Sequence, residues 1–178
     1  MAVGNSVSAV GLVGDPGRMM ELQELTSDDW KVWRDLRLAA LAEAPYAFGS
    51  TLADWVDAPE ERWRARLEAP GVQAAVVLID GTPIGMGGGA PAEAEGVFEL
   101  VSMWVAPAGR GKGVGDLLMA WLERIARAQG AHTLELAVAE GNDKAIGLYE
   151  RSGYVVTGAE EEGNDGRILK LHIMHKSL

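Results

Sequence analysis

Residues 100–115 read LVSMWVAPAGRGKGVG. An apolar run ends at Pro107, a basic loop with four glycines follows, and an amphipathic segment begins at Val114. This order predicts a strand, a glycine-rich loop and the start of a helix. Glycine lets the backbone come close to an anion, and a helix N-terminus adds a partial positive charge. The segment therefore predicts a phosphate-binding loop, and the alternative is an ordinary glycine-rich turn.

The spacing of this loop excludes two familiar phosphate-binding motifs. A Walker loop requires a hydroxyl residue directly after its Gly-Lys pair, but Gly113 stands there. A dinucleotide fingerprint, G-x-G-x-x-G, starts at neither Gly109 nor Gly111, because the sixth position holds no glycine in either register. Residues 110–115 do fit the spacing Arg-x-x-Gly-x-Gly.

That spacing resembles the pyrophosphate loop, [QR]-x-x-G-x-[GA], of the GNAT superfamily of acyl-CoA-dependent N-acyltransferases. Residues 142–154, NDKAIGLYERSGY, resemble a second segment of the superfamily, N-x-x-A-x-x-x-Y…G-[FY]. The resemblance extends over Glu21–His175. It implies a single GNAT-type α/β domain with a central mixed, mostly antiparallel sheet flanked by helices. It also implies acetyl-CoA as the acyl donor and a primary amine as the acceptor.

Hydrophobic periodicity and turn residues predict the element order β-α-α-β-β-β-α-β-α-β-β. Helices are expected over Trp30–Leu41, Pro59–Leu67, Val114–Ala128 and Asn142–Ser152, with Ser27 as the first N-cap and Gly153 just past the last helix. Strands are expected over Glu21–Leu25, Val72–Ile79, Pro83–Ala90, Val97–Val105, His132–Val138, Tyr154–Thr157 and Ile168–His175, with turns at Asp80-Gly81 and around Glu160–Gly166.

The chain has 178 residues, which suits one domain with a substantial core. Met19 or Met20 is the expected original start. Residues 1–18 are then a flexible N-terminal extension, or residues foreign to the native protein, and residues 19–178 form the N-acetyltransferase domain.

Composition narrows the partners and the compartment. The net charge of −10 disfavours a nucleic-acid partner and suits a cationic amine. No apolar run is long enough to span a membrane and no signal peptide is apparent, so a cytoplasmic location is expected. The three histidines fit no zinc motif, so no metal is expected. Members of the superfamily often dimerise, so the resemblance leaves a homodimer open.

The absence of cysteine bears on the mechanism. Without cysteine there is no thiolate metal site, no disulfide and no acetyl-cysteine intermediate. Direct attack of the amine on the thioester, in a ternary complex, is therefore the expected route.

Holding the acyl donor is assigned mainly to backbone groups. The N–H groups expected to face the pyrophosphate belong to Gly111, Gly113, Val114, Gly115 and Asp116, while Arg110 and Lys112 add charge. By resemblance, the backbone of Met103, Trp104 and Val105 bonds the pantetheine arm, while their side chains pack in the core. Asn142 is an N-cap, a cofactor contact, or both.

Two side chains are candidates for proton transfer. Glu99 is a carboxylate between Phe98 and Leu100, and an apolar setting raises a carboxyl pKa into a range useful for a base. It lies eleven residues before Arg110, as does the catalytic glutamate in the histone-acetylating branch of the superfamily. The resemblance makes Tyr149 the acid, because a phenol with a pKa of about 10 can protonate a thiolate whose conjugate acid has a pKa of about 8.5. The alternatives are a solvated glutamate and a buried structural tyrosine.

The acceptor is less constrained by the sequence. By resemblance, the connection Tyr46–Asp57 forms one wall of the acceptor site. Phe48 and Trp55 are expected to hold a cationic amine there by cation–π contact, unless these rings pack onto the core. The leading interpretation is an N-acetyltransferase for a small primary amine. The alternatives are a protein or peptide N-acetyltransferase and a non-catalytic acyl-CoA-binding module.

Overall fold

The computed structural model of the chain describes residues 19–164 and 167–178. The expected extension, residues 1–18, and the tip of the expected acidic hairpin, residues 165–166, lie outside the described residues. Within the described residues, seven strands form one sheet in the order β1-β2-β3-β4-β5-β7-β6. Only the β4–β5 pair of this sheet is parallel, so the sheet is mixed and mostly antiparallel, as predicted.

The predicted order of elements is confirmed. The strands are β1 (Met20–Glu24), β2 (Gln73–Ile79), β3 (Thr82–Pro91), β4 (Val97–Val105), β5 (Thr133–Ala139), β6 (Val155–Asn164) and β7 (Arg167–Ser177). The helices are α1 (Trp30–Glu43), α2 (Glu60–Glu68), α3 (Val114–Ala128) and α4 (Asp143–Arg151), with short 3-10 turns η1 (Ser27–Asp29), η2 (Pro45–Ala47) and η3 (Pro107–Gly109).

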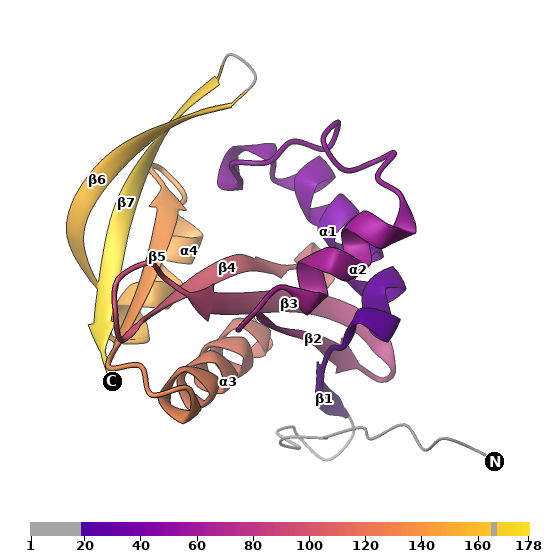
Figure 1. Cartoon of the computed structure of the whole chain (residues 1–178), viewed down its shortest axis with the longest axis horizontal. Coiled ribbons are helices and arrows are strands. Elements are labelled where there is room, and N and C mark those ends of the chain that lie inside the picture. The colour runs from indigo at the N-terminus through magenta and orange to yellow at the C-terminus, as the bar shows by residue number, and fades with distance from the viewer. Residues whose placement is uncertain (1–18, 165–166) are drawn as a thin grey trace.

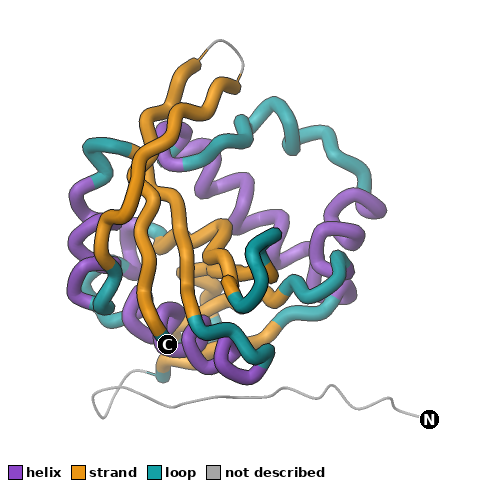
Figure 2. The backbone as a smooth tube through the Cα atoms, turned by 60° about the vertical axis from the view of Figure 1, so that its left-hand side comes forward, coloured by secondary structure: helices purple, strands orange, loops and turns teal. Residues whose placement is uncertain are grey.

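Helices cover both faces of the sheet (Figures 1 and 2). Helices α1 and α2 enclose one hydrophobic cluster, which includes Trp33 and Trp63. Helices α3 and α4 enclose the other, which includes Leu118 and Leu148. Among residues 19–164 and 167–178, no helix combines the length and the apolar character needed to cross a membrane.

Two local expectations were wrong. The residue that caps the first turn is Thr26 rather than Ser27: Asp28 N–H donates to its side-chain oxygen at 3.3 Å, and Thr26 N–H donates back to Asp29 at 2.9 Å. This reciprocal pair of hydrogen bonds satisfies two backbone N–H groups at once, those of Asp28 and Thr26. A cap at Ser27 would not satisfy both. Strand β6 also continues to Asn164, and strand β7 begins at Arg167. Most of the expected acidic turn is therefore strand. Ladder pairing with the neighbouring strand outweighs the low strand propensity of glutamate and glycine there.

The glycines of β3 allow α3 to pack closely on the middle of the sheet. A Cβ atom on Gly89 would lie 2.2 Å from the Phe98 ring and 2.8 Å from Leu122 of α3. A Cβ atom on Gly85 would lie 2.6 Å from Val114, the first residue of α3. Glycine in a strand is unfavourable by propensity, but here it marks a close approach of neighbouring elements.

Replacing Gly89 by alanine is expected to lower the free energy of unfolding by about 1–3 kcal/mol, because the added methyl group overpacks the core. Gly158 of β6 is a matched control, because a Cβ atom there meets only Ile173, at 3.9 Å. Its change to alanine is expected to alter stability by less than about 0.5 kcal/mol. Urea unfolding of the two variants measures the difference. Equal midpoints would contradict the packing argument.

Candidate active site

The sheet splits beside the glycine loop. Strand β4 pairs with β5 only over Val97–Glu99, opposite Thr133–Glu135. On its other side, β4 has a bulge where Ser102 and Met103 oppose Gly87, and Ser102 has a positive φ of 60°. Bulges bend a strand, and a non-glycine residue at positive φ is uncommon. The bulge and the split leave the β5-facing edge of residues 100–105 without a strand partner among the described residues.

A first cavity, the donor groove, lies along the glycine loop, the start of α3, the end of β4 and α4. Its volume is about 860 Å³. Except for Lys112, all the predicted cofactor-binding residues line this groove. The residues that do so are Met103, Trp104, Val105, Arg110, Gly111, Gly113, Val114, Gly115, Asp116 and Asn142.

Backbone donors at the end of this groove suit an anion. Gly111 and Gly113 have positive φ angles of 72° and 82°, and a Cβ atom on either would meet nothing within 4 Å. The first hydrogen bond of α3 runs from Leu117 N–H to Gly113 O, at 3.0 Å. The three N–H groups at 114–116 therefore have no acceptor within the helix. Free N–H groups at a helix N-terminus are a ready site for phosphate, so the loop fits a pyrophosphate.

The side-chain contacts of two residues of the groove, Arg110 and Asn142, differ from those that the sequence predicted. Arg110 donates to Glu43 of α1 at 2.8 Å and to the Val105 carbonyl at 3.1 Å, so its charge is shared with a carboxylate. The Arg110 and Trp104 hydrogen bonds lower the pKa of Glu43. Asn142 stands at the N-cap position of α4, as predicted, but its side chain makes no capping hydrogen bond. Its side chain stays available to the groove.

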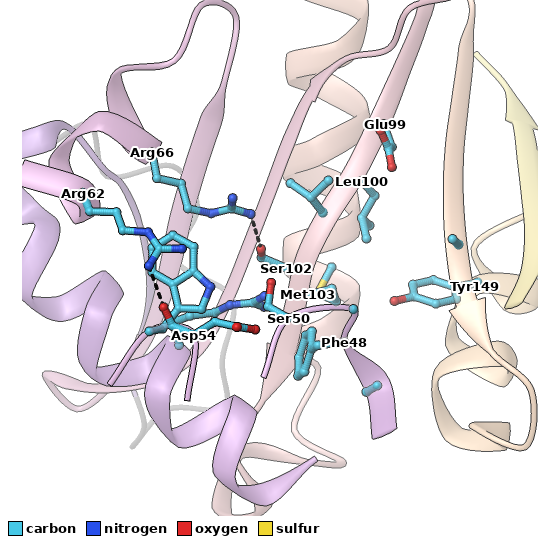
Figure 3. A pocket seen from close by; sticks show the side chains of 16 residues that line it. Phe48, Ser50, Asp54, Arg62, Arg66, Glu99, Leu100, Ser102, Met103 and Tyr149 are labelled. Carbon is cyan, nitrogen blue, oxygen red and sulfur yellow. Dashed lines mark hydrogen bonds between the residues drawn. The ribbon is translucent and has the colours of Figure 1, made fainter. Parts of the chain in front are cut away.

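A second cavity, the acceptor pocket, has a volume of about 600 Å³ and lies between α1, α2 and β4 (Figure 3). It is lined by Arg37, Ala47, Phe48, Gly49, Ser50, Asp54, Trp55, Arg62, Arg66, Glu99, Leu100, Val101, Ser102, Met103, Ala137 and Tyr149. The two cavities share Ala47, Phe48, Met103 and Tyr149, so they meet at these residues.

Glu99 lies in the acceptor pocket with its side chain half-buried. Burial raises the pKa of its carboxyl, and the nearby carboxylates of Glu135 and Glu160 raise this pKa further. Glu135 is the register partner of Glu99 on β5, and it bonds His175 of β7 at 2.5 Å. A carboxyl whose pKa is raised in this way is a stronger base than an ordinary glutamate.

Tyr149 lies where the two cavities meet. It is only 5% exposed, and burial raises the pKa of its phenol. Figure 3 shows its hydroxyl pointing toward the acceptor pocket, on the same side as Glu99. The phenol therefore stays neutral near neutral pH and keeps its O–H as a hydrogen-bond donor, although its raised pKa makes full transfer of the proton harder.

Phe48 and Trp55 line the acceptor pocket, but other side chains of the chain lie over their rings. The Arg37 guanidinium lies over Phe48 at 4.5 Å, and the guanidiniums of Arg62 and Arg66 lie over Trp55 at 4.2 and 5.7 Å. The chain's own cations therefore already contact these rings, and the expected cation–π contact with an amine stays a prediction.

Sequence reasoning missed the three arginines of this pocket and Ser102. One signal was present in the sequence: Trp33, Arg37 and Leu41 follow one another at intervals of four, so Arg37 interrupts the apolar stripe of α1. In the structure it is 5% exposed. Ser102 carried no comparable signal, because its position depends on the bulge in β4.

Comparison with known proteins agrees with this geometry. The split sheet beside the glycine loop fits the acyltransferase class that the sequence motifs indicated. Residues 22–154 match the model of the acetyltransferase (GNAT) family, and the chain belongs to that family. No curated protein sequence matches the chain.

Several solved structures share the fold. A GNAT acetyltransferase from Streptococcus pneumoniae is 19% identical, with a TM-score of 0.75 over 89% of this chain and 99% of that chain. A ribosomal-protein-alanine N-acetyltransferase from Brucella melitensis is 26% identical, with a TM-score of 0.70 over 88% and 99%. A phosphinothricin acetyltransferase from Sinorhizobium meliloti, solved with acetyl-CoA, is 19% identical, with a TM-score of 0.73 over 89% and 88%.

Proposed function

We propose that the protein is an acetyl-CoA-dependent N-acetyltransferase that acts on a primary amine. The observation that carries this proposal is the meeting of two cavities at Met103 and Tyr149. One cavity ends on the backbone donors of the glycine loop, and the other holds Glu99. A donor with a pyrophosphate and an acceptor with an ionisable nitrogen would meet at that junction.

Different groups of the chain bind the donor and transfer the protons. Acetyl-CoA supplies the acetyl group as a thioester. The N–H groups of Gly111 and of residues 113–116 bind its pyrophosphate, and the unpaired edge of β4 at 103–105 holds the pantetheine arm. Glu99 takes a proton from the ammonium group of the acceptor, directly or through water. Tyr149 donates a proton toward the sulfur. Without a cysteine in the chain, we propose direct transfer in a ternary complex.

We further propose that the acceptor is a small molecule. Support comes from the size of the acceptor pocket, about 600 Å³, which falls in the range typical of small-molecule sites. A peptide amine is the second candidate, because the Brucella structure is named for a ribosomal protein acceptor. The cytoplasmic location, the homodimer and the boundary at residue 19 remain predictions.

The glycine loop offers a test of donor binding. Gly113→Val is expected to weaken acetyl-CoA binding by about ten- to a hundredfold, because a branched side chain opposes the positive φ and projects where the pyrophosphate would lie. Gly130→Val is the matched control: Gly130 follows the other end of α3, has a φ of +78° and also has open space around its Cβ position. Titration calorimetry should show unchanged affinity for the control. Equal losses in both variants would contradict the loop assignment.

A further inference from the structure

The acceptor pocket gathers positive charge in an acidic protein. The chain carries a net charge of −10, yet three guanidiniums, those of Arg37, Arg62 and Arg66, line this one cavity. The carboxylates that line it are Glu99 and Asp54, and Asp54 accepts the Thr51 N–H at 2.6 Å. The guanidiniums therefore outnumber the carboxylates, against the charge of the molecule as a whole.

Arg37 is the most unusual of the three. Its residue is 5% exposed, and its Nη1 atom is buried without any hydrogen-bond partner among the described residues. Burial, together with the nearby charge of Arg66, lowers the pKa of Arg37 to about 10, so it stays protonated at neutral pH. A buried charged donor without an acceptor is costly, so an anionic group bound beside this guanidinium would stabilise it.

The other two guanidiniums donate to neutral acceptors. Arg66 donates from Nη2 to the Ser102 hydroxyl at 3.2 Å, and Arg62 donates from Nη1 to the Asp54 backbone carbonyl at 2.6 Å. The rings of Phe48 and Trp55 hold the guanidiniums in place. Guanidiniums fixed in this way before binding are well suited to grip a planar oxyanion, because their paired N–H groups match two oxygens at once.

We propose that Arg37 and Arg66, with Ser102, form a subsite for a carboxylate of the acceptor, so that the acceptor is an amino-acid-like molecule rather than a simple or polycationic amine. This inference rests on the proposed function. Figure 3 shows Arg66 and Ser102 on one side of the pocket, with Glu99 and Tyr149 on the other. The carboxylate would lie at the arginine side, and the amine would then face Glu99 and the junction with the donor groove.

The test compares ligands that differ only in the negative charge of this carboxylate. Each N-acetyl amino acid, which is the product such an enzyme would release, is titrated into the CoA-saturated protein beside its carboxamide. The acid of at least one pair is expected to bind, with its carboxamide about ten- to a hundredfold weaker. Equal affinity for acid and carboxamide, binding of no acid in the full side-chain panel, or binding of inorganic phosphate alone would each overturn the proposal.

Substitutions test which residues cause the difference in affinity between acid and carboxamide. Arg66→Gln is expected to remove the difference between acid and carboxamide, whereas Arg34→Gln, on the exposed side of α1 and paired with Asp35, is expected to keep it. Arg37→Gln should also remove the difference in affinity between acid and carboxamide. If Arg37→Gln does not fold, the result for Arg66→Gln alone tests the proposal. An acid preference that survives in Arg66→Gln would place the carboxylate elsewhere.

Failure of this inference differs from failure of the proposed function. If acetyl-CoA binds and neutral amines are acetylated as fast as amino acids, the proposed function is supported and the carboxylate subsite is wrong. If acetyl-CoA does not bind, the proposed function is wrong and the subsite falls with it.

Discussion

Replacement of Glu99 by glutamine is expected to lower kcat by about a hundred- to ten-thousandfold, the usual contribution of a positioned base. The amide keeps the shape of the side chain but accepts no proton from the amine. Affinity for acetyl-CoA should not change, because Glu99 lines the acceptor pocket and not the donor groove. Initial rates and calorimetric titration of the same preparation measure the two quantities. A variant that keeps more than about a tenth of the wild-type kcat would remove Glu99 from the role of base.

The pH profile gives this prediction a second readout. Only the ionised carboxylate of Glu99 can accept a proton, so kcat/KM should fall as the pH drops through its pKa. Burial and the carboxylates of Glu135 and Glu160 raise that pKa, so the acidic limb should lie above the pH at which an ordinary glutamate titrates. Glu135→Gln removes one of these charges and should move the limb to lower pH. Glu21→Gln, on β1 at the far edge of the sheet, is the control and should leave the limb in place.

Replacement of Tyr149 by phenylalanine is expected to lower kcat by about a hundredfold, because the departing sulfur loses its proposed proton donor. The ring, and with it the packing at the junction of the two cavities, is retained. The same assay should show little change in KM for acetyl-CoA, since the backbone donors of the loop are untouched.

Tyr154→Phe is the matched control for this variant. The Tyr154 ring lies 6.0 Å from that of Tyr149, and burial likewise raises the pKa of its phenol. Its hydroxyl, however, is buried without a hydrogen-bond partner among the described residues, and it lines neither cavity. Removal of an unpartnered buried hydroxyl should leave kcat unchanged and stability equal or slightly higher. Equal losses of kcat in both variants would mean that Tyr149 acts only through packing.

Local signals predicted most of the fold. The apolar spacing of residues 114–128 gave α3 with its observed bounds. Asp80-Gly81 forms the expected turn, with both residues at positive φ, and Gly153 follows α4 at a φ of 92°. The cap at Thr26 was a local error of one residue. The larger error lies where a distant partner decides: β6 and β7 are long because they pair with each other, and the sequence of either strand alone does not show this.

The donor groove was more predictable than the acceptor pocket for a similar reason. The glycine loop is contiguous in sequence, and its backbone does the proposed work. The acceptor pocket combines Arg37 of α1, Arg66 of α2 and Ser102 of β4, which only the packed fold brings together. The net charge pointed to a cationic acceptor, but the local charge of the pocket has the opposite sign, because neighbouring side chains rather than composition set the field within a cavity.

The most direct test of the central claim is release of free CoA thiol from acetyl-CoA across a panel of amino acids, simple amines and peptide N-termini. The chain contains no cysteine, so a thiol-trapping dye has no background from the protein. The account predicts amine-dependent thiol release that is fastest with small amino-acid-like acceptors and is lost in Glu99→Gln. Acetyl-CoA that remains intact with every acceptor, or thiol release that is unchanged in Glu99→Gln, would contradict it.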